Sequence, residues 1–437
     1  MLPPLKTVRA GLHRTTEAIA TELARPGGPT PAWDDLEWRL AMAAAAAHGV
    51  SPLLWRHSRW IHPRWRQFLE SQHQHVAIRH ARIAARLARL DARAHAAGLA
   101  MTPLKGAALH AFECYAPGER PMADIDLLVE EDALGAASGL IEGIGYVASF
   151  DSWRHRVFKP VSGTPPAVLG EHRDTPVNIE LHTRVRERLP VSVVDITEQV
   201  RPRDSGAGLQ PYPSRAALLA HLLLHAAGNI CARSLRLIHL HDIALLARNM
   251  EPEEWMFLWR GGASWWALPP LQTVARYYPD AIPAVVRTTL ARDCPVLLRV
   301  MSRRQSLSQL SCSELWLHAF PGIEWSRSVF EAARYVAGRV RPSAEKQRER
   351  QDMARTQLWL RDPAWVTAGQ ARRIFTWMTR KIPRMDTMHV VRAALGLARL
   401  PCNEAVSQPP PMNAFATVQP DALTASRHTP VSSPQRS

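Results

Sequence analysis

The clearest pattern of apolar positions lies in residues 72–97. Its apolar side chains recur every three, four or seven positions, at Val76, Ile83, Leu87, Leu90 and Ala94. That spacing places them on one face of an α-helix. Gly98 follows directly and is a favourable residue for ending the helix. Residues 36–50 are also predicted as a helix, so the sequence predicts a helical N-terminal region over residues 1–98.

After Gly98 the pattern changes to short apolar runs that are typical of strands. These runs cover residues 99–104, 125–129, 146–150, 156–158 and 177–182. Residues 107–115 and 132–144 are predicted as helices between them, the second with Asp132 as its N-cap and Gly145 after its end. The alternation predicts a core of mixed strands and helices over residues 99–200.

A loop rich in Pro and Gly, residues 201–213, separates this core from further helical patterns. Helices are predicted at residues 214–228, 234–248, 325–340, 344–360 and 388–400. They indicate a helical C-terminal domain over residues 214–402. Residues 403–437 are rich in Pro, Ser, Thr and Gln and lack a periodic apolar face, so we predict a disordered tail. The predicted fold class is α+β, with a small mixed-sheet core embedded in mostly helical N- and C-terminal regions.

The charge of the chain is unevenly distributed. The 437 residues carry a formal net charge of +15, but residues 101–182 have a net charge of −6, while residues 51–100 have +7 and residues 330–400 have +9. Only five of the 54 basic residues are lysines, so each lysine is more informative than any arginine. An acidic centre between basic flanks favours a metal-bound polyphosphate as ligand and argues against duplex DNA.

Cysteine usage and hydropathy indicate the compartment. The five cysteines lie far apart and form no C-x-x-C pair, which predicts reduced thiols in a cytoplasmic protein. The first 20 residues carry charges throughout, so no signal peptide is predicted. The absence of a run of ~18 apolar residues predicts no membrane span.

Two aspartates mark the candidate site. Asp124 and Asp126 stand at positions i and i+2 of a predicted strand, so both carboxylates project from the same face. Along a strand they lie roughly 6–7 Å apart, a spacing at which they can share hard cations such as Mg²⁺ (or Mn²⁺). A pair of such ions needs a third carboxylate. Glu180 is the best candidate, because the strand alternation places it on one face with Asn178 and His182.

Basic residues flank these carboxylates. Lys105 and Gly106 stand at a predicted strand-to-helix junction, where backbone N–H groups and a lysine can meet a phosphate chain. Arg120 precedes the Asp124 strand by four residues, and its guanidinium can bind phosphate oxygens in a bidentate manner. We therefore predict Lys105, Gly106 and Arg120 as residues that can contact phosphate groups.

The order of these motifs resembles the uncharacterised nucleotidyltransferase family of the DNA polymerase β-like superfamily. The resemblance covers roughly residues 75–250 and rests on Leu-Lys-Gly (104–106), Arg-x-x-x-Asp-x-Asp (120–126), Gly-Tyr (145–146) and Glu-Leu-His (180–182). It implies Asp124, Asp126 and Glu180 as catalytic metal ligands, and Lys105, Gly106 and Arg120 as nucleotide-binding residues. It also implies an enzyme that transfers a nucleoside monophosphate from an NTP to an acceptor hydroxyl. The acceptor is left open: a small molecule, a peptide, a protein or RNA.

Two other functions stay open at this point. A nucleotide-sugar glycosyltransferase also uses Asp-x-Asp to hold a metal and a diphosphate, although the helical first 95 residues argue against it. A non-catalytic, arginine-rich helical binding protein is the second alternative.

Histidines occur in two predicted helices. His221 and His225 have a zinc-chelating spacing, but their leucine-rich surroundings favour a polar-core role. The run from His239 to Asp242 is also predicted to have a polar-core role, or to belong to a helix that caps the site.

Overall fold

The structure is a computed structural model, and it describes residues 1–163, 168–203, 206–259, 264–348 and 368–397. Residues 1–398 group into one compact unit. The chain begins with four helices, which are α1 (Leu5–Ala24), α2 (Asp35–Ala47), α3 (Ser51–His57) and α4 (Pro63–Ala96). The central region follows as β1 (Ala100–Pro103), α5 (Lys105–Ala111), β2 (Asp124–Leu128), α6 (Leu134–Glu142), β3 (Tyr146–Asp151), β4 (His155–Pro160) and β5 (Asn178–His182).

The remaining elements are mostly helical. They are β6 (Arg186–Arg188), β7 (Val193–Asp195), α7 (Thr197–Val200), β8 (Gly208–Leu209), α8 (Arg215–Ala232), α9 (Leu237–Ala247), α10 (Pro252–Met256), α11 (Leu268–Tyr277), α12 (Ala284–Asp293), α13 (Val296–Arg304), α14 (Leu307–Leu310), α15 (Val329–Val340), α18 (Gln370–Thr379) and α19 (Met385–Ala394). The fold is therefore α+β with helical flanks, as predicted.

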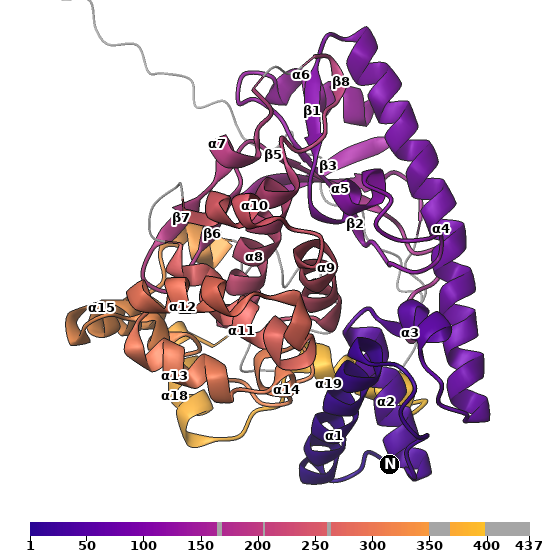
Figure 1. Ribbon diagram of the computed structural model, residues 1–437, viewed down its shortest axis with the longest axis vertical. Helices are drawn as coiled ribbons and strands as arrows, with labels where there is room; N and C mark the ends of the chain where they lie inside the picture. The colour runs from indigo at the N-terminus through magenta and orange to yellow at the C-terminus, as the bar shows by residue number, and fades with distance from the viewer. Residues whose placement is uncertain (164–167, 204–205, 260–263, 349–367, 398–437) are drawn as a thin grey trace, which may run out of the picture. The chain divides into compact units, whose positions relative to one another are not determined.

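A six-stranded mixed sheet lies in the upper part of the view in Figure 1. Its strand order is β3-β4-β5-β2-β1-β8, and a separate two-stranded sheet joins β6 to β7. Strand β2 pairs in parallel with β5 and antiparallel with β1. Because side chains alternate along a strand, Ile125 and Leu127 of β2 face one side of this sheet while Asp124 and Asp126 face the other.

The apolar face of the sheet is covered by α4 and α6. The periodic residues Ile83, Leu87, Leu90 and Ala94 of α4 pack there against the apolar side chains of the central strands. Helix α4 runs from the N-terminal helices past the sheet (Figure 1), and Gly98 follows its end with φ +66°, as its predicted role requires. Burial on this face leaves the carboxylate face of the sheet free to form a site.

The second, larger core belongs to the helices. It joins residues of α1–α4 to residues of α8, α9 and α11 and includes buried tryptophans such as Trp65 and Trp325. Within the described residues, one helix, α8, is long and apolar enough to cross a membrane by length and composition, and 67% of it is buried inside the fold. The leucines of α8 are buried in this core, and this burial explains why the helix is so apolar.

The structure corrects several local predictions. Helix α6 begins at Leu134 with Ala133 as N-cap, so Asp132 does not cap it. The predicted loop 201–213 contains β8, where Gly208 N donates to Leu99 O over 2.7 Å and extends the sheet. Helices α11 to α13 follow where no helix was predicted. In the predicted helix 344–360 the described residues 344–348 are helical. The predicted tail 403–437 lies outside the described residues, and the predicted domain boundaries stay predictions.

Candidate functional site

The three predicted carboxylates lie on two adjacent strands. The parallel register of β2 and β5 sets Asp126 opposite Glu180 and Asp124 opposite Asn178. Asp126 is buried, with 4% of its side chain exposed, whereas 19% of the Glu180 side chain is exposed. The two-residue alternation predicted the polar faces of both strands, and in the structure Asp126 and Glu180 occupy paired positions on adjacent strands.

Lys105 contacts this carboxylate group directly. Its Nζ donates to Asp126 Oδ1 over 2.8 Å. The residue begins α5 with a φ of +47°, a left-handed conformation that costs a non-glycine residue about 1–2 kcal/mol. Strain of this kind persists only where the surroundings determine it. The contact of Lys105 with Asp126 is one such restraint on its conformation.

Two histidines complete the cluster. His182 Nε2 lies 2.9 Å from Asp126 Oδ1 and 3.8 Å from Glu180 Oε2. His155, the first residue of β4, places Nδ1 3.5 Å from the same Glu180 oxygen. His182 was expected on this face, but nothing in the sequence singled out His155.

Burial and mutual repulsion set the charge states of the carboxyl groups. Burial raises the pKa of Asp124, and the neighbouring charge of Asp126 raises it further. Burial, then Asp126 and Asp124, raise the pKa of Glu180 as well. Burial also acts on Asp126, but Lys105 and His182 outweigh it and hold the pKa of Asp126 well below its usual range. Crowded carboxylates of this kind are stabilised by added positive charge, which is what a divalent cation supplies.

Arg120 has a different partner from the one its sequence position suggested. Its guanidinium makes a bidentate ion pair with Asp242 of α9, with Nε 2.9 Å from Oδ1 and Nη2 2.8 Å from Oδ2. Tyr115 donates its hydroxyl to Asp242 Oδ1 over 2.7 Å. The Asp242 side chain is 1% exposed, so its carboxylate is shielded from solvent. The predicted phosphate contact of Arg120 stays a prediction, and Arg120 also has a structural partner.

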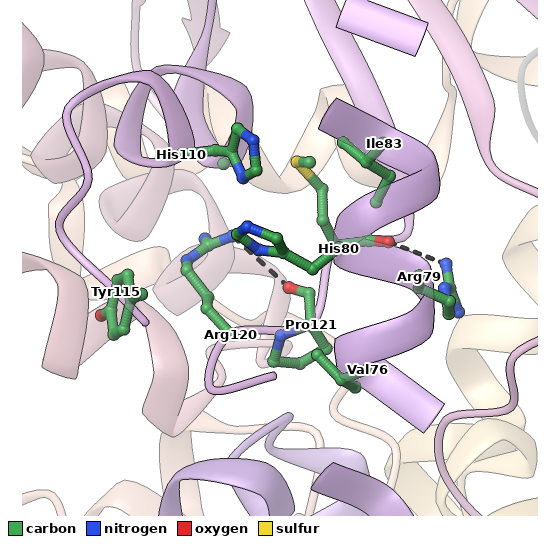
Figure 2. A pocket seen from close by; sticks show the side chains of 10 residues that line it. Val76, Arg79, His80, Ile83, His110, Tyr115, Arg120 and Pro121 are labelled. Atoms are coloured by element: carbon green, nitrogen blue, oxygen red, sulfur yellow. Dashed lines mark hydrogen bonds between the residues drawn. The ribbon is translucent and has the colours of Figure 1, made fainter. Parts of the chain in front are cut away.

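Gly106 allows Arg120 to approach α5 closely. A Cβ atom added at Gly106 would lie 2.6 Å from Arg120 Nη1 and 3.1 Å from Met122 Sδ. Figure 2 shows the pocket beside this contact, which residues of α4, α5 and the loop before β2 line. His80 and His110 lie next to each other in its wall, with ring centroids 4.3 Å apart. Gly106 thus borders a pocket, and its predicted role in nucleotide binding stays a prediction.

The remaining histidine pairs have local partners. Tyr212 Oη lies 2.7 Å from His221 Nδ1, and His225 lies near Asn229 and Glu187. These contacts agree with the predicted polar-core role of His221 and His225. Sequence reasoning missed the role of Asp242, although a lone aspartate in an apolar helix requires a partner once it is buried.

Comparison with known proteins gives one match. The model of a family described as uncharacterised nucleotidyltransferase matches residues 34–280, more than half of the chain. The match includes every predicted site residue. No curated protein and no solved structure matches the chain.

Proposed function

The chain belongs to the uncharacterised nucleotidyltransferase family, and from this we propose that it is a metal-dependent enzyme that transfers a nucleoside monophosphate from an NTP to an acceptor hydroxyl. Family membership supports nucleotidyl transfer in general. The observation that carries the finer proposal is the juxtaposition of Asp126 and Glu180 across β2 and β5, with Asp124 two residues along the same face.

The donor set fits a divalent cation. Asp124, Asp126 and Glu180 offer carboxylate oxygens, which are the ligands that Mg²⁺ and Mn²⁺ prefer. When bound, such ions neutralise the triphosphate and lower the pKa of an acceptor hydroxyl. The three carboxylates would hold them, with Asp126 fixed in orientation by Lys105 and His182.

The reaction that follows is a displacement at phosphorus. The acceptor oxygen forms a bond to the α-phosphorus, the bond from the α-phosphorus to the bridging oxygen breaks, and pyrophosphate leaves with that electron pair. The hydroxyl proton passes to a base or to solvent. Lys105 lies close enough to the carboxylates for its ammonium group to offset charge that develops on the phosphates. Arg120, which Asp242 holds beside Gly106, would serve the same purpose.

For the acceptor we propose a chemical class, and for the protein a compartment. The acceptor is a hydroxyl of a small molecule, a peptide, a protein or RNA. A cytoplasmic location fits the supply of NTP and the free cysteines Cys114, Cys231, Cys294 and Cys312. The family match favours nucleotidyl transfer over a sugar-nucleotide glycosyltransferase.

Nucleotide binding can be tested without knowing the acceptor. Each of the four NTPs is added with and without Mg²⁺ or Mn²⁺, and the melting temperature is measured. We expect one NTP to raise it only when a metal is present, and Asp126→Asn to abolish the rise. Asp132→Asn removes an exposed carboxylate outside the site and serves as the matched control. An equal rise in Asp126→Asn, or no metal-dependent rise with any NTP, contradicts the proposal.

One observation favours the alternative of an arginine-rich binding protein. A groove beside the sheet is lined by several arginines, among them Arg82, Arg86 and Arg89 from one face of α4. Such a row of guanidinium groups can contact successive phosphates of a nucleic acid. Salt-dependent RNA binding that Asp124→Ala and Asp126→Ala leave unchanged, together with no NTP turnover, would favour this function over transfer.

A further inference from the structure

A second set of ligand atoms lies beside the carboxylates. His155 Nδ1, Glu180 Oε2 and His182 Nε2 all lie within 4.8 Å of one another. They come from two adjacent antiparallel strands, in which His155 is registered opposite His182. Two imidazole nitrogens and one carboxylate oxygen form a donor set that catalytic zinc sites use.

Two of the distances between these atoms are close to those between ligand atoms around one metal ion. Ligand atoms ~2.0–2.2 Å from Zn²⁺ lie roughly 3.0–3.5 Å from each other in tetrahedral or octahedral arrangements. Glu180 Oε2 lies 3.5 Å from His155 Nδ1 and 3.8 Å from His182 Nε2. Asp126 Oδ1, 2.9 Å from His182 Nε2, is a fourth donor within reach. The group therefore needs only small side-chain adjustments to surround one ion.

His155 Nδ1 supplies an independent observation. The atom is buried and has no hydrogen-bond partner among the described residues. A buried polar atom without a hydrogen-bond partner is costly, and an ion bound at this position would supply a partner. Three carboxyl groups gather on this face, those of Asp124, Asp126 and Glu180, and Lys105 contacts Asp126.

We propose that His155, His182 and Glu180 bind a first-row transition ion of the Zn²⁺ class, with Asp126 as a bridging ligand toward the Asp124 side of the site. Imidazole nitrogens favour such ions, whereas Mg²⁺ prefers oxygen ligands. This inference deepens the proposed function, because it gives the site two unlike metal positions. His155 is then a metal ligand that the carboxylate motif alone does not predict.

Metal binding without nucleotide tests the proposal. Zn²⁺ is titrated calorimetrically into the full chain in the presence of excess Mg²⁺, and the histidine imidazoles are followed by ¹⁵N NMR. We expect one Zn²⁺ to bind despite the Mg²⁺, with shifts of two imidazole nitrogens. His155→Phe keeps a ring in the buried site but removes its nitrogens, and we expect it to weaken Zn²⁺ binding at least tenfold. His57→Gln, at an exposed position, is the matched control.

The outcomes separate this inference from the proposed function. Equal Zn²⁺ affinity in His155→Phe and wild type, or no imidazole shift in the wild type, overturns the metal site. If His155→Phe fails to fold, as judged by its metal-free melting temperature, His155→Gln and the imidazole shifts of the wild type decide instead. Asp124→Asn should retain Zn²⁺ binding whether or not it transfers nucleotides. Zn²⁺ bound through His155 in a protein without NTP turnover would support the metal site alone.

Discussion

The ion pair of Arg120 with Asp242 joins the sheet region to helix α9, and its removal should be costly. Asp242 is 1% exposed and Arg120 is 13% exposed, and the two share a bidentate contact. Replacing one partner of a buried pair leaves the other charge unpaired, at a cost of about 3–5 kcal/mol. Asp242→Leu should therefore lower the free energy of unfolding by that amount. Tyr115 then loses its acceptor as well.

A double-mutant cycle isolates the interaction. Arg120→Met should also destabilise strongly, but the double variant should cost much less than the sum, because both charges are gone together. We expect a coupling free energy of at least about 2 kcal/mol from urea denaturation followed by tryptophan fluorescence. Asp151→Leu is the matched control, since it breaks an exposed pair with Arg156 and should cost only about 0–1 kcal/mol. Additive single effects, or a cost for Asp242→Leu no larger than for Asp151→Leu, would show that Arg120 and Asp242 do not form a strongly coupled buried pair.

Two further predictions concern the surroundings of the site. Gly106→Ala places a methyl group 2.6 Å from Arg120 Nη1, so it should lower the free energy of unfolding by about 1–3 kcal/mol. It should also reduce the metal-dependent rise in melting temperature with NTP. If stability and this rise are both unchanged, Arg120 moves aside freely. Burial lowers the pKa of His48 to about 3, and its Nδ1 accepts a hydrogen bond from Leu237 N. Between about pH 6.5 and 3, His48 therefore binds a proton in the unfolded chain but not in the folded chain. Its contribution to stability is lost as the pH falls through this window. From pH 6.5 to 4 the wild type should lose up to about 3 kcal/mol more than His48→Leu, and equal losses in pH-dependent denaturation would contradict this.

The sequence was sufficient for features that depend on local periodicity. The helical face of residues 76–94 and the shared face of Asp124 and Asp126 follow from repeats of 3.6 and 2 residues, and both occur in the structure. Glu180 was also predicted on a polar strand face because of a clear alternation, and it lies opposite Asp126 in the sheet. These features need no knowledge of which segments pair.

Features that depend on distant contacts were not accessible in this way. Strand β8 has two residues, and its identity as a strand comes from pairing with β1, more than 100 positions earlier. His155 enters the site only because β4 pairs with β5. The partner of Arg120 lies 122 positions away, and no local pattern distinguishes a guanidinium aimed at a phosphate from one aimed at a buried aspartate.

Nucleotidyl transfer at the carboxylate site is tested by following the radioactive label of an NTP. The NTP is labelled either at the α- or at the γ-phosphorus and incubated with Mg²⁺ or Mn²⁺ and with small-molecule, peptide, protein and RNA fractions as acceptors. We predict that the α-label enters an acceptor while the γ-label leaves as pyrophosphate, and that Asp124→Ala stops both. Transfer of the γ-label, or equal transfer of the α-label by Asp124→Ala, would contradict the account.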